Sequence, residues 1–149
     1  MSKKIVFVCT GNTCRSPMAE VILRKLAHDR KVSVEVQSAG LAAFPGLPPA
    51  PEAVEACREK GMDLSAHQSQ PLGKDLVLGS DVILTMTSKH KEMILKKMPA
   101  LEGKVEQLSK FAGDGEVDVE DPVGQSVEVY RQTRDQLEEL IQKSLDHLK

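Results

Sequence analysis

Aromatic residues are scarce in this sequence: they make up 3% of its 149 residues, with no tryptophan and one tyrosine. A strong net charge is also absent, because 20 basic and 22 acidic residues leave a formal charge of −2. No field of one sign therefore indicates nucleic acid or an anionic membrane as a partner. No apolar run approaches the roughly 18 residues of a membrane span. The five apolar residues after Lys4 are too few for the core of a signal peptide.

Cysteine is scarce as well, and the odd number of three favours a reducing compartment over a disulfide-linked scaffold. The four histidines show no spacing typical of metal ligands, so no metal is expected. The length fits one domain over residues 1–149, and no repeat, low-complexity tract or boundary interrupts it. The sequence thus predicts a cytoplasmic monomer of one domain that binds neither nucleic acid nor membrane.

Strand and helix signals alternate along the chain. Strand signals are carried by residues 3–9, 32–38, 80–86 and 104–108. Helices are expected at residues 17–29, 51–61, 88–98 and 126–148. The first and third strand segments are continuous apolar runs, typical of central parallel strands, while the other two are alternating or short, as edge strands are. This alternation predicts an α/β fold with a four-stranded parallel sheet in the order 2-1-3-4 and helices on both faces.

The loop that follows the first predicted strand, from Cys9 to Ser16, carries the clearest chemical signal. In the expected sheet the strand order reverses between strands 1 and 3, and ligands bind beyond the carboxyl ends at that point. Small residues follow Cys9, and Gly11 and Asn12 tolerate left-handed geometry, so successive N–H groups can surround an anion. Ser16 as cap and Pro17 as first residue predict the start of a helix, whose dipole adds positive potential. That potential favours a thiolate at Cys9.

An arginine completes this loop. Arg15 supplies a charged, planar fork that suits two oxygens of a phosphate, and Ser16 can donate a hydrogen bond to the sulfur of Cys9. An anion site with a nucleophile at its floor indicates phosphoryl transfer through a thiol. A nucleotide-binding loop of the Walker type is excluded because no Gly-Lys-Ser/Thr follows. The predicted phosphate-binding residues are Thr10, Gly11, Asn12, Thr13, Cys14, Arg15 and Ser16.

A candidate acid lies far along the chain. Asp121 precedes Pro122, so its backbone is held extended in a stiff loop after the last predicted strand. In a parallel sheet that loop reaches the same carboxyl edge as Cys9. We therefore expect Asp121 near the thiol, where a carboxylic acid can protonate a leaving group.

The segment VCTGNTCRSPMAE (8–20) resembles the signature loop of the low-molecular-weight protein tyrosine phosphatase family. Three further segments resemble that family: SAG (38–40), DLSAHQS (63–69) and EDPVGQSVEVYRQTRDQLEEL (120–140). The resemblance implies a cofactor-free phosphatase that acts on phosphorylated proteins through a phosphocysteine intermediate. It makes Cys9 the nucleophile, Arg15 the phosphate ligand, and Asp121 the general acid and later the base for water. It also implies supporting positions behind the loop for Asn12, Ser16, Ser38 and His67.

Departures from the tyrosine-directed members of the family indicate a different substrate. Val123-Gly124 stands where those members carry an aromatic pair, which leaves Phe44 as the one evident aromatic wall. A flat ring gains much of its binding from stacking, so this mouth suits phosphotyrosine badly. Thr13 stands where those members tend to have a bulky aliphatic residue, and the bacterial protein-arginine phosphatase branch carries threonine there. The sequence is most similar to that branch, which implies protein phosphoarginine as the substrate.

Three alternative functions stay open. A protein tyrosine phosphatase is the nearest of them. An arsenate reductase of the same fold needs resolving cysteines near the third strand, and residues 80–93 contain none. A binding module without catalysis would keep Arg15 but would not need both Cys9 and Asp121. Cys14 is a candidate redox partner that could capture an oxidised Cys9 as a disulfide, whereas Cys57 is expected in the core.

Overall fold

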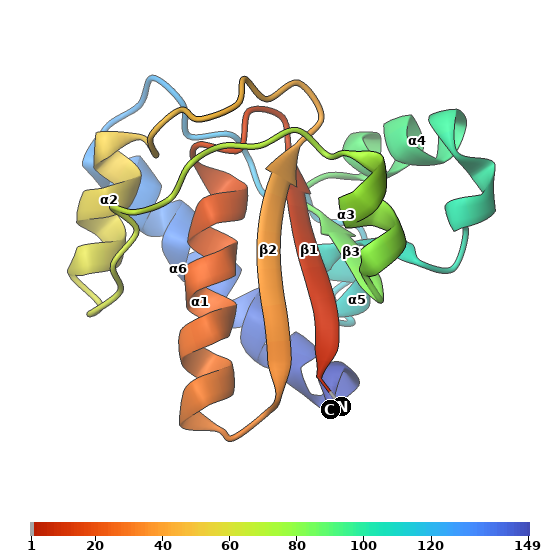
Figure 1. Cartoon of the computed structure of the whole chain (residues 1–149). Coiled ribbons are helices and arrows are strands. Elements are labelled where there is room, and N and C mark those ends of the chain that lie inside the picture. The colour runs from red at the N-terminus through yellow and green to blue at the C-terminus, as the bar shows by residue number, and fades with distance from the viewer. Residues whose placement is uncertain (1) are drawn as a thin grey trace.

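The computed structural model describes residues 2–149, which form a four-stranded parallel sheet flanked by helices (Figure 1). The strands are β1 (Lys3–Cys9), β2 (Val34–Gly40), β3 (Val82–Thr85) and β4 (Val105–Gln107). Their order in the sheet is β2-β1-β3-β4, and every pairing is parallel, so the predicted order 2-1-3-4 is confirmed.

Six α-helices and two 3-10 turns connect and follow the strands in the described part of the chain. The α-helices are α1 (Arg15–Asp29), α2 (Pro51–Arg58), α3 (Lys74–Gly79), α4 (Ser88–Lys97), α5 (Leu108–Phe111) and α6 (Val127–Ser144). The 3-10 turns are η1 (Pro99–Leu101) and η2 (Leu145–Leu148). The short helices α3 and α5 were not expected from the sequence, because four to six residues are too few to show a helical period.

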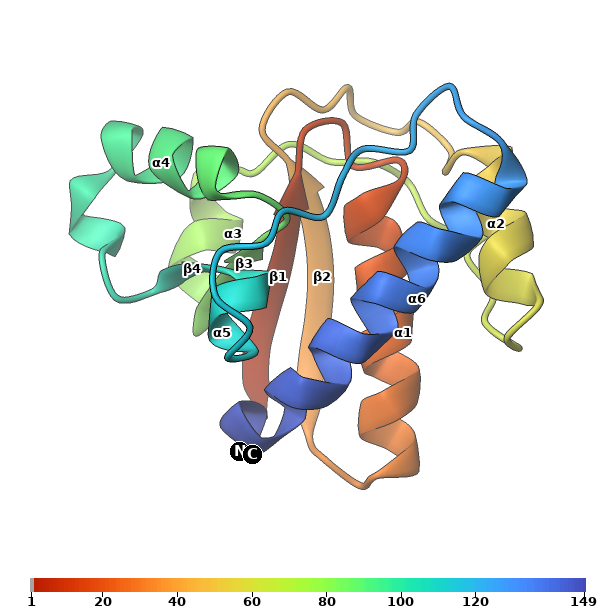
Figure 2. The same cartoon turned by 180° about the vertical axis from the view of Figure 1, so that it is seen from behind.

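Both faces of the sheet are covered, and this explains why β1 is a continuous apolar run. Ile5 and Phe7 pack into a core with α1, α2, α5 and α6, whereas Val6 and Val8 pack on the opposite face against α3 and α4. Figure 2 shows α6 crossing the first of these faces beside α1. Successive strand residues point to opposite faces, so a strand covered on both sides needs apolar residues at every position.

Several element boundaries differ from the sequence-based prediction, and two of these differences lie at the loop after β1 and at the strand beside it. Helix α1 begins at Arg15, so Ser16 is not its cap and Pro17 is not its first residue; Cys14 is the N-cap residue and makes no side-chain capping bond. Pro17 is tolerated because the first turn of a helix has no intrahelical partner for its N–H groups. Strand β2 spans Val34–Gly40, which is two residues later than expected, and its last residue pairs with Cys9.

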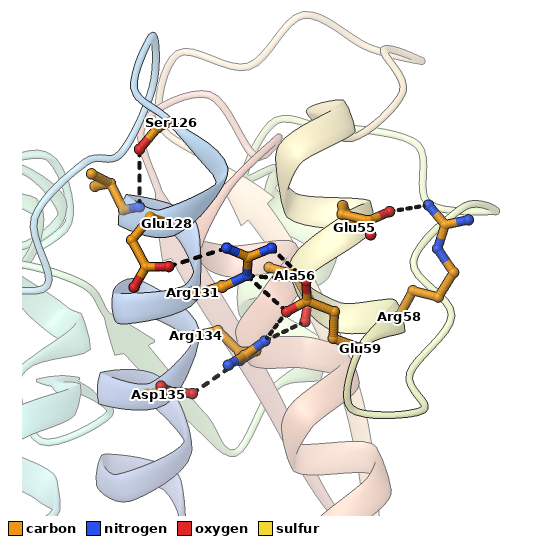
Figure 3. A network of polar contacts seen from close by, with 10 residues as sticks. Glu55, Ala56, Arg58, Glu59, Ser126, Glu128, Arg131, Arg134 and Asp135 are labelled. Atoms are coloured by element: carbon orange, nitrogen blue, oxygen red, sulfur yellow. Dashed lines mark hydrogen bonds and ion pairs between the residues drawn. The ribbon is translucent and has the colours of Figure 1, made fainter.

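A network of ion pairs and hydrogen bonds connects the end of α2 to α6 (Figure 3). Glu59, which follows α2, accepts hydrogen bonds from Arg131 at 2.7 Å and from Arg134 at 3.0 Å. Arg134 is buried and also donates to the carbonyl of Ala56 at 2.7 Å. These two arginines, with Arg131 the larger influence, lower the pKa of Glu59 from 4.5 to about 2. The two helices are therefore joined by an ion-pair network that depends on an ionised Glu59.

We expect Glu59→Gln to lower the melting temperature near pH 7 and to matter progressively less in acid. Because the pKa of Glu59 is lowered on folding, its stabilisation is present above about pH 4.5 and is lost as the pH falls through about 2. Thermal unfolding of both proteins across this range measures the effect, with Glu92→Gln on the exposed side of α4 as the matched control. A difference that stays constant down to pH 2 would contradict this assignment.

No helix within residues 2–149 is both long and apolar enough to cross a membrane.

Candidate active site

Cys9 lies at the carboxyl end of β1, at the floor of the loop that leads into α1. Its side chain is buried, and two hydrogen-bonding groups face the sulfur. The Ser16 hydroxyl lies 2.9 Å from Sγ, and the backbone N–H of Asn12 donates to Sγ at 3.3 Å. Both groups can donate a hydrogen bond to sulfur. The predicted contact between Ser16 and Cys9 is confirmed.

Asn12 organises the loop from its centre. It adopts a left-handed conformation with φ of 57°, which the sequence analysis considered accessible to this residue. Its amide group donates to Ser16 Oγ at 2.8 Å and to Ser38 Oγ at 2.9 Å, and its side-chain oxygen accepts from the N–H of Gln70 at 2.9 Å. Ser16 Oγ therefore accepts from Asn12, and its own hydrogen can go to the Cys9 sulfur at 2.9 Å or to the carbonyl of Ala39 at 3.5 Å.

Ser38 and His67, which the family resemblance placed behind the loop, both contact Asn12. The Nε2 atom of His67 lies 2.8 Å from the carbonyl oxygen of Asn12. Ser38 accepts from the Asn12 amide and donates to Glu20 Oε1 at 2.6 Å. Glu20 and Gln70 also support the loop. Neither could be predicted from the sequence, because nothing in the local pattern distinguishes them from surface polar residues.

Gly40 allows the loop to lie directly on the end of β2. A Cβ atom at this position would lie 2.5 Å from the carbonyl oxygen of Thr10 and 3.1 Å from the backbone nitrogen of Asn12. The next two N–H groups, of Leu41 and Ala42, bond the carbonyls of Cys9 and Thr10 at 3.0 and 2.9 Å. Glycine at this position is therefore required by close backbone approach.

Arg15 and Asp121 meet above the same loop. The Arg15 guanidinium is buried, and its Nη1 donates to the carbonyl of Val119 at 2.9 Å. Its Nη2 lies 3.6 Å from Oδ2 of Asp121, whose side chain is 44% exposed. The other carboxylate oxygen of Asp121 accepts from the N–H of Val123 at 3.1 Å. The structure thus brings Cys9, Arg15 and Asp121 to one edge of the sheet, as their positions after β1 and β4 predict.

An open hollow of about 170 Å³ lies among these residues. It is lined by Cys9, Thr10, Gly11, Asn12, Thr13, Cys14, Arg15, Asp121 and Val123. Ser16, the remaining predicted phosphate-binding residue, is fully buried beneath the hollow. Phe44 is 75% exposed, and the lining is formed without it. A thiol, a guanidinium and a carboxylate at one small hollow can bind an oxyanion, attack it and exchange a proton.

Residues 4–149 match the family described as "Low molecular weight phosphotyrosine protein phosphatase". The chain belongs to this family. The protein-arginine-phosphatase of Bacillus subtilis (strain 168) is 43% identical over 145 residues, which cover 97% of this chain and 96% of the relative. The low molecular weight protein-tyrosine-phosphatase PtpB of Staphylococcus haemolyticus (strain JCSC1435) is 41% identical over 140 residues, covering 94% of this chain and 96% of the relative.

A solved structure with the same fold is described as the YwlE arginine phosphatase carrying a phosphorylated active-site serine. It superposes with a TM-score of 0.94 at 42% identity and covers 97% of this chain and 95% of its own. The family membership and the fold that the sequence analysis inferred are therefore confirmed.

Cys14 of this phosphatase lines the hollow as a protonated thiol. It is buried, and burial raises its pKa above the ordinary value of 9.0. Its sulfur lies 3.3 Å from the hydroxyl of Tyr130 on α6, a contact between residues 116 positions apart. Nothing in the local sequence around Tyr130 indicates this contact. The role of Cys14 as a redox partner of Cys9 stays a prediction.

The other histidine and cysteine side chains differ in burial. Cys57 is fully buried in the core, as predicted. His28 is exposed, whereas His90 is buried against the catalytic loop and is not solvated. Across residues 2–149, no cluster of three or more His, Cys, Asp or Glu side chains could hold a metal ion.

Proposed function

We propose that this phosphatase removes phosphate from phosphoarginine side chains of proteins through a covalent phosphocysteine intermediate. The observation that carries the choice of substrate is the rim of the hollow, where Thr13 and Val123 stand and where none of the lining residues in the described chain is aromatic. An aliphatic guanidino group needs no stacking wall, whereas a phenyl ring gains much of its binding from one. The name of the Bacillus subtilis relative supports the same choice.

In the first step, the loop N–H groups and the Arg15 guanidinium hold the oxygens of the phosphoryl group. The Cys9 thiolate attacks phosphorus and forms the S–P bond while the P–N bond to the arginine side chain breaks. Asp121 donates a proton to the departing nitrogen, so arginine leaves as a guanidinium cation. The backbone N–H of Asn12 donates to the sulfur, and the Ser16 hydroxyl lies 2.9 Å from it, so both groups contact the attacking atom.

In the second step, the Asp121 carboxylate accepts a proton from water, and the hydroxide attacks the phosphocysteine. The S–P bond breaks, inorganic phosphate forms, and the thiolate is regenerated. The position of Asp121 supports both roles, because its exposed carboxylate lies 3.6 Å from the Arg15 guanidinium and lines the same hollow as Cys9. The same residue serves as acid and base in turn, since each step returns it to the state that the next one needs.

The substrates of this activity would be phosphorylated proteins, because the hollow is open to solvent and can admit a side chain from a second protein. We also retain, as predictions, a cytoplasmic location, a monomeric state and the lack of nucleic acid or membrane partners. Size-exclusion chromatography tests the monomeric state, and cell fractionation tests the cytoplasmic location.

Protein phosphotyrosine is the second candidate substrate. The family description and the name of the Staphylococcus haemolyticus relative both favour it. Comparing kcat/KM for phosphoarginine and phosphotyrosine peptides decides between the two substrates. A preference for phosphotyrosine would refute the arginine assignment and leave the phosphocysteine chemistry intact.

We expect Thr13→Ile to shift the preference of the enzyme away from phosphoarginine. The substitution adds apolar bulk to the rim and removes a hydroxyl next to the scissile bond. A change of this size in a pocket typically alters discrimination by about 10- to 200-fold. The shift should come mainly from lost activity on phosphoarginine, because Val123 and Gly124 still offer no ring to stack on. The ratio of the two kcat/KM values measures it.

The matched control is Thr13→Val, which removes the hydroxyl with little change in volume. If bulk decides specificity, the valine variant keeps the preference, and if the hydroxyl decides it, both variants shift alike. Equal losses on both substrates in both variants would show that Thr13 only supports the loop.

A further inference from the structure

His90 is a buried titratable residue that the chemistry above does not use. It lies in the first turn of α4 and is only 6% exposed. Its Nε2 atom lies 3.0 Å from the hydroxyl of Thr10, the residue directly after Cys9, although the two are 80 positions apart. Thr10 in turn lines the hollow. A helix on the far side of the sheet thus reaches the phosphate-binding loop through one imidazole.

A helix cap orders the backbone that carries the imidazole. The backbone N–H of His90 donates to the hydroxyl oxygen of Thr87, the N-cap residue of α4, at 3.1 Å. The cap orders the first turn of α4. The contact between Nε2 and Thr10 directs the ring toward the loop.

The surroundings of the ring indicate which nitrogen carries the proton. Its Nδ1 atom is buried and has no hydrogen-bond partner within residues 2–149. A neutral imidazole has one N–H, and a buried donor without a partner is costlier than a bare nitrogen. The favoured tautomer therefore carries its hydrogen on Nε2 and donates it to the oxygen of Thr10.

The charges around the ring keep it neutral. Burial lowers the pKa of His90 to about 4, and the nearby Arg15 guanidinium acts in the same direction. The negative charges of Asp118 and Asp121 act in the opposite direction on the pKa of His90, but they do not outweigh burial. At neutral pH the ring is therefore uncharged and carries one N–H.

We propose that His90 is a positioning residue that occupies the oxygen of Thr10 as an acceptor, so that the Thr10 hydroxyl donates its own proton to the phosphoryl group in the hollow. A hydroxyl has one hydrogen, and accepting from Nε2 leaves that hydrogen free for an anion. In the other tautomer, with the hydrogen on Nδ1, the Thr10 hydroxyl would donate its hydrogen to Nε2 and could not donate it to the phosphoryl group. The inference rests on the proposed phosphatase activity and adds a donor to the transferring group.

A double-mutant cycle on kcat/KM, with a generic aryl phosphate as substrate, tests this coupling. Thr10→Val removes the hydroxyl and should lower kcat/KM about 10- to 100-fold, the range for a hydrogen bond to a charged group. His90→Asn should lower it about tenfold, because its shorter amide cannot reach Thr10. The double variant should lose no more than Thr10→Val alone, since His90 acts only through that hydroxyl.

The matched control for His90→Asn is His90→Gln, whose amide nitrogen reaches the place of Nε2 and should restore most of the activity. Melting temperatures of all variants accompany the kinetics, so that losses are compared among folded proteins. Multiplying losses in the double variant, or equal losses with glutamine and asparagine, would overturn the role of His90. A wild-type protein that hydrolyses no phosphate compound would instead refute the proposed function itself.

Discussion

Cys9→Ser is expected to lower kcat/KM more than 100-fold on every phosphorylated substrate. A serine hydroxyl at the floor of the hollow is neutral and has no base to activate it, whereas a thiol is the better nucleophile of the two groups. Phosphate and vanadate should still bind, because Arg15 and the loop N–H groups do not depend on the sulfur. Steady-state kinetics and vanadate titration together measure this separation of binding from turnover.

A slow first step in the serine variant would agree with this assignment. Intact-protein mass spectrometry would detect the phosphoserine that such a step leaves. The matched control is Cys57→Ser in the core, where burial raises the pKa of the thiol to about 12. Folded Cys57→Ser protein should retain activity. Residual activity above about one per cent in the Cys9 variant would refute its role as nucleophile.

The second large effect is expected from Asp121→Asn. General acid catalysis by a positioned side chain contributes about 10²- to 10⁴-fold, so the rate on phosphoarginine, whose nitrogen must be protonated to leave, should fall within that range. An activated aryl phosphate departs without a proton, and its first step should be affected much less. The amide oxygen of asparagine can still accept from the N–H of Val123, so the loop keeps its local geometry.

Two comparisons separate an acid from a structural aspartate. Glu120→Gln removes the neighbouring exposed carboxylate and should leave the rates unchanged. Single-turnover measurements on both kinds of substrate isolate the first step, in which the proton is donated. Equal losses on phosphoarginine and on the activated aryl phosphate would show that Asp121 holds the loop and does not supply the proton.

Much of the fold could be read from patterns that involve only neighbouring residues. The continuous apolar runs at residues 3–9 and 80–86 placed β1 and β3 in the centre of the sheet, because strands covered on both faces need apolar residues at every position. The sheet order then brought Cys9 and Asp121 to one edge, since the carboxyl ends of parallel strands lie together. The candidate nucleophile, the arginine and the candidate acid could all be named without coordinates.

Predictions from local sequence patterns were wrong at the start of α1, next to the phosphate-binding loop. Ser16 and Pro17 looked like the start of a helix, yet α1 begins at Arg15, and the Ser16 hydroxyl bonds Cys9 in place of a helix N–H. The short helices α3 and α5 were also not predicted. Their residues are helical because they connect the sheet to its neighbours and not because a sequence period requires it.

The contacts that set the chemistry of the hollow were decided only by the tertiary structure. Tyr130 reaches Cys14 across 116 positions, and His90 reaches Thr10 across 80. Neither residue carries a local signal, because a tyrosine or histidine on a helix looks the same in sequence whether it faces solvent, core or catalytic loop. The sequence by itself determined which residues could react. The packing of α4 and α6 around the sheet determined which side chains hold, shield and orient them, because such contacts depend on where distant helices lie in space.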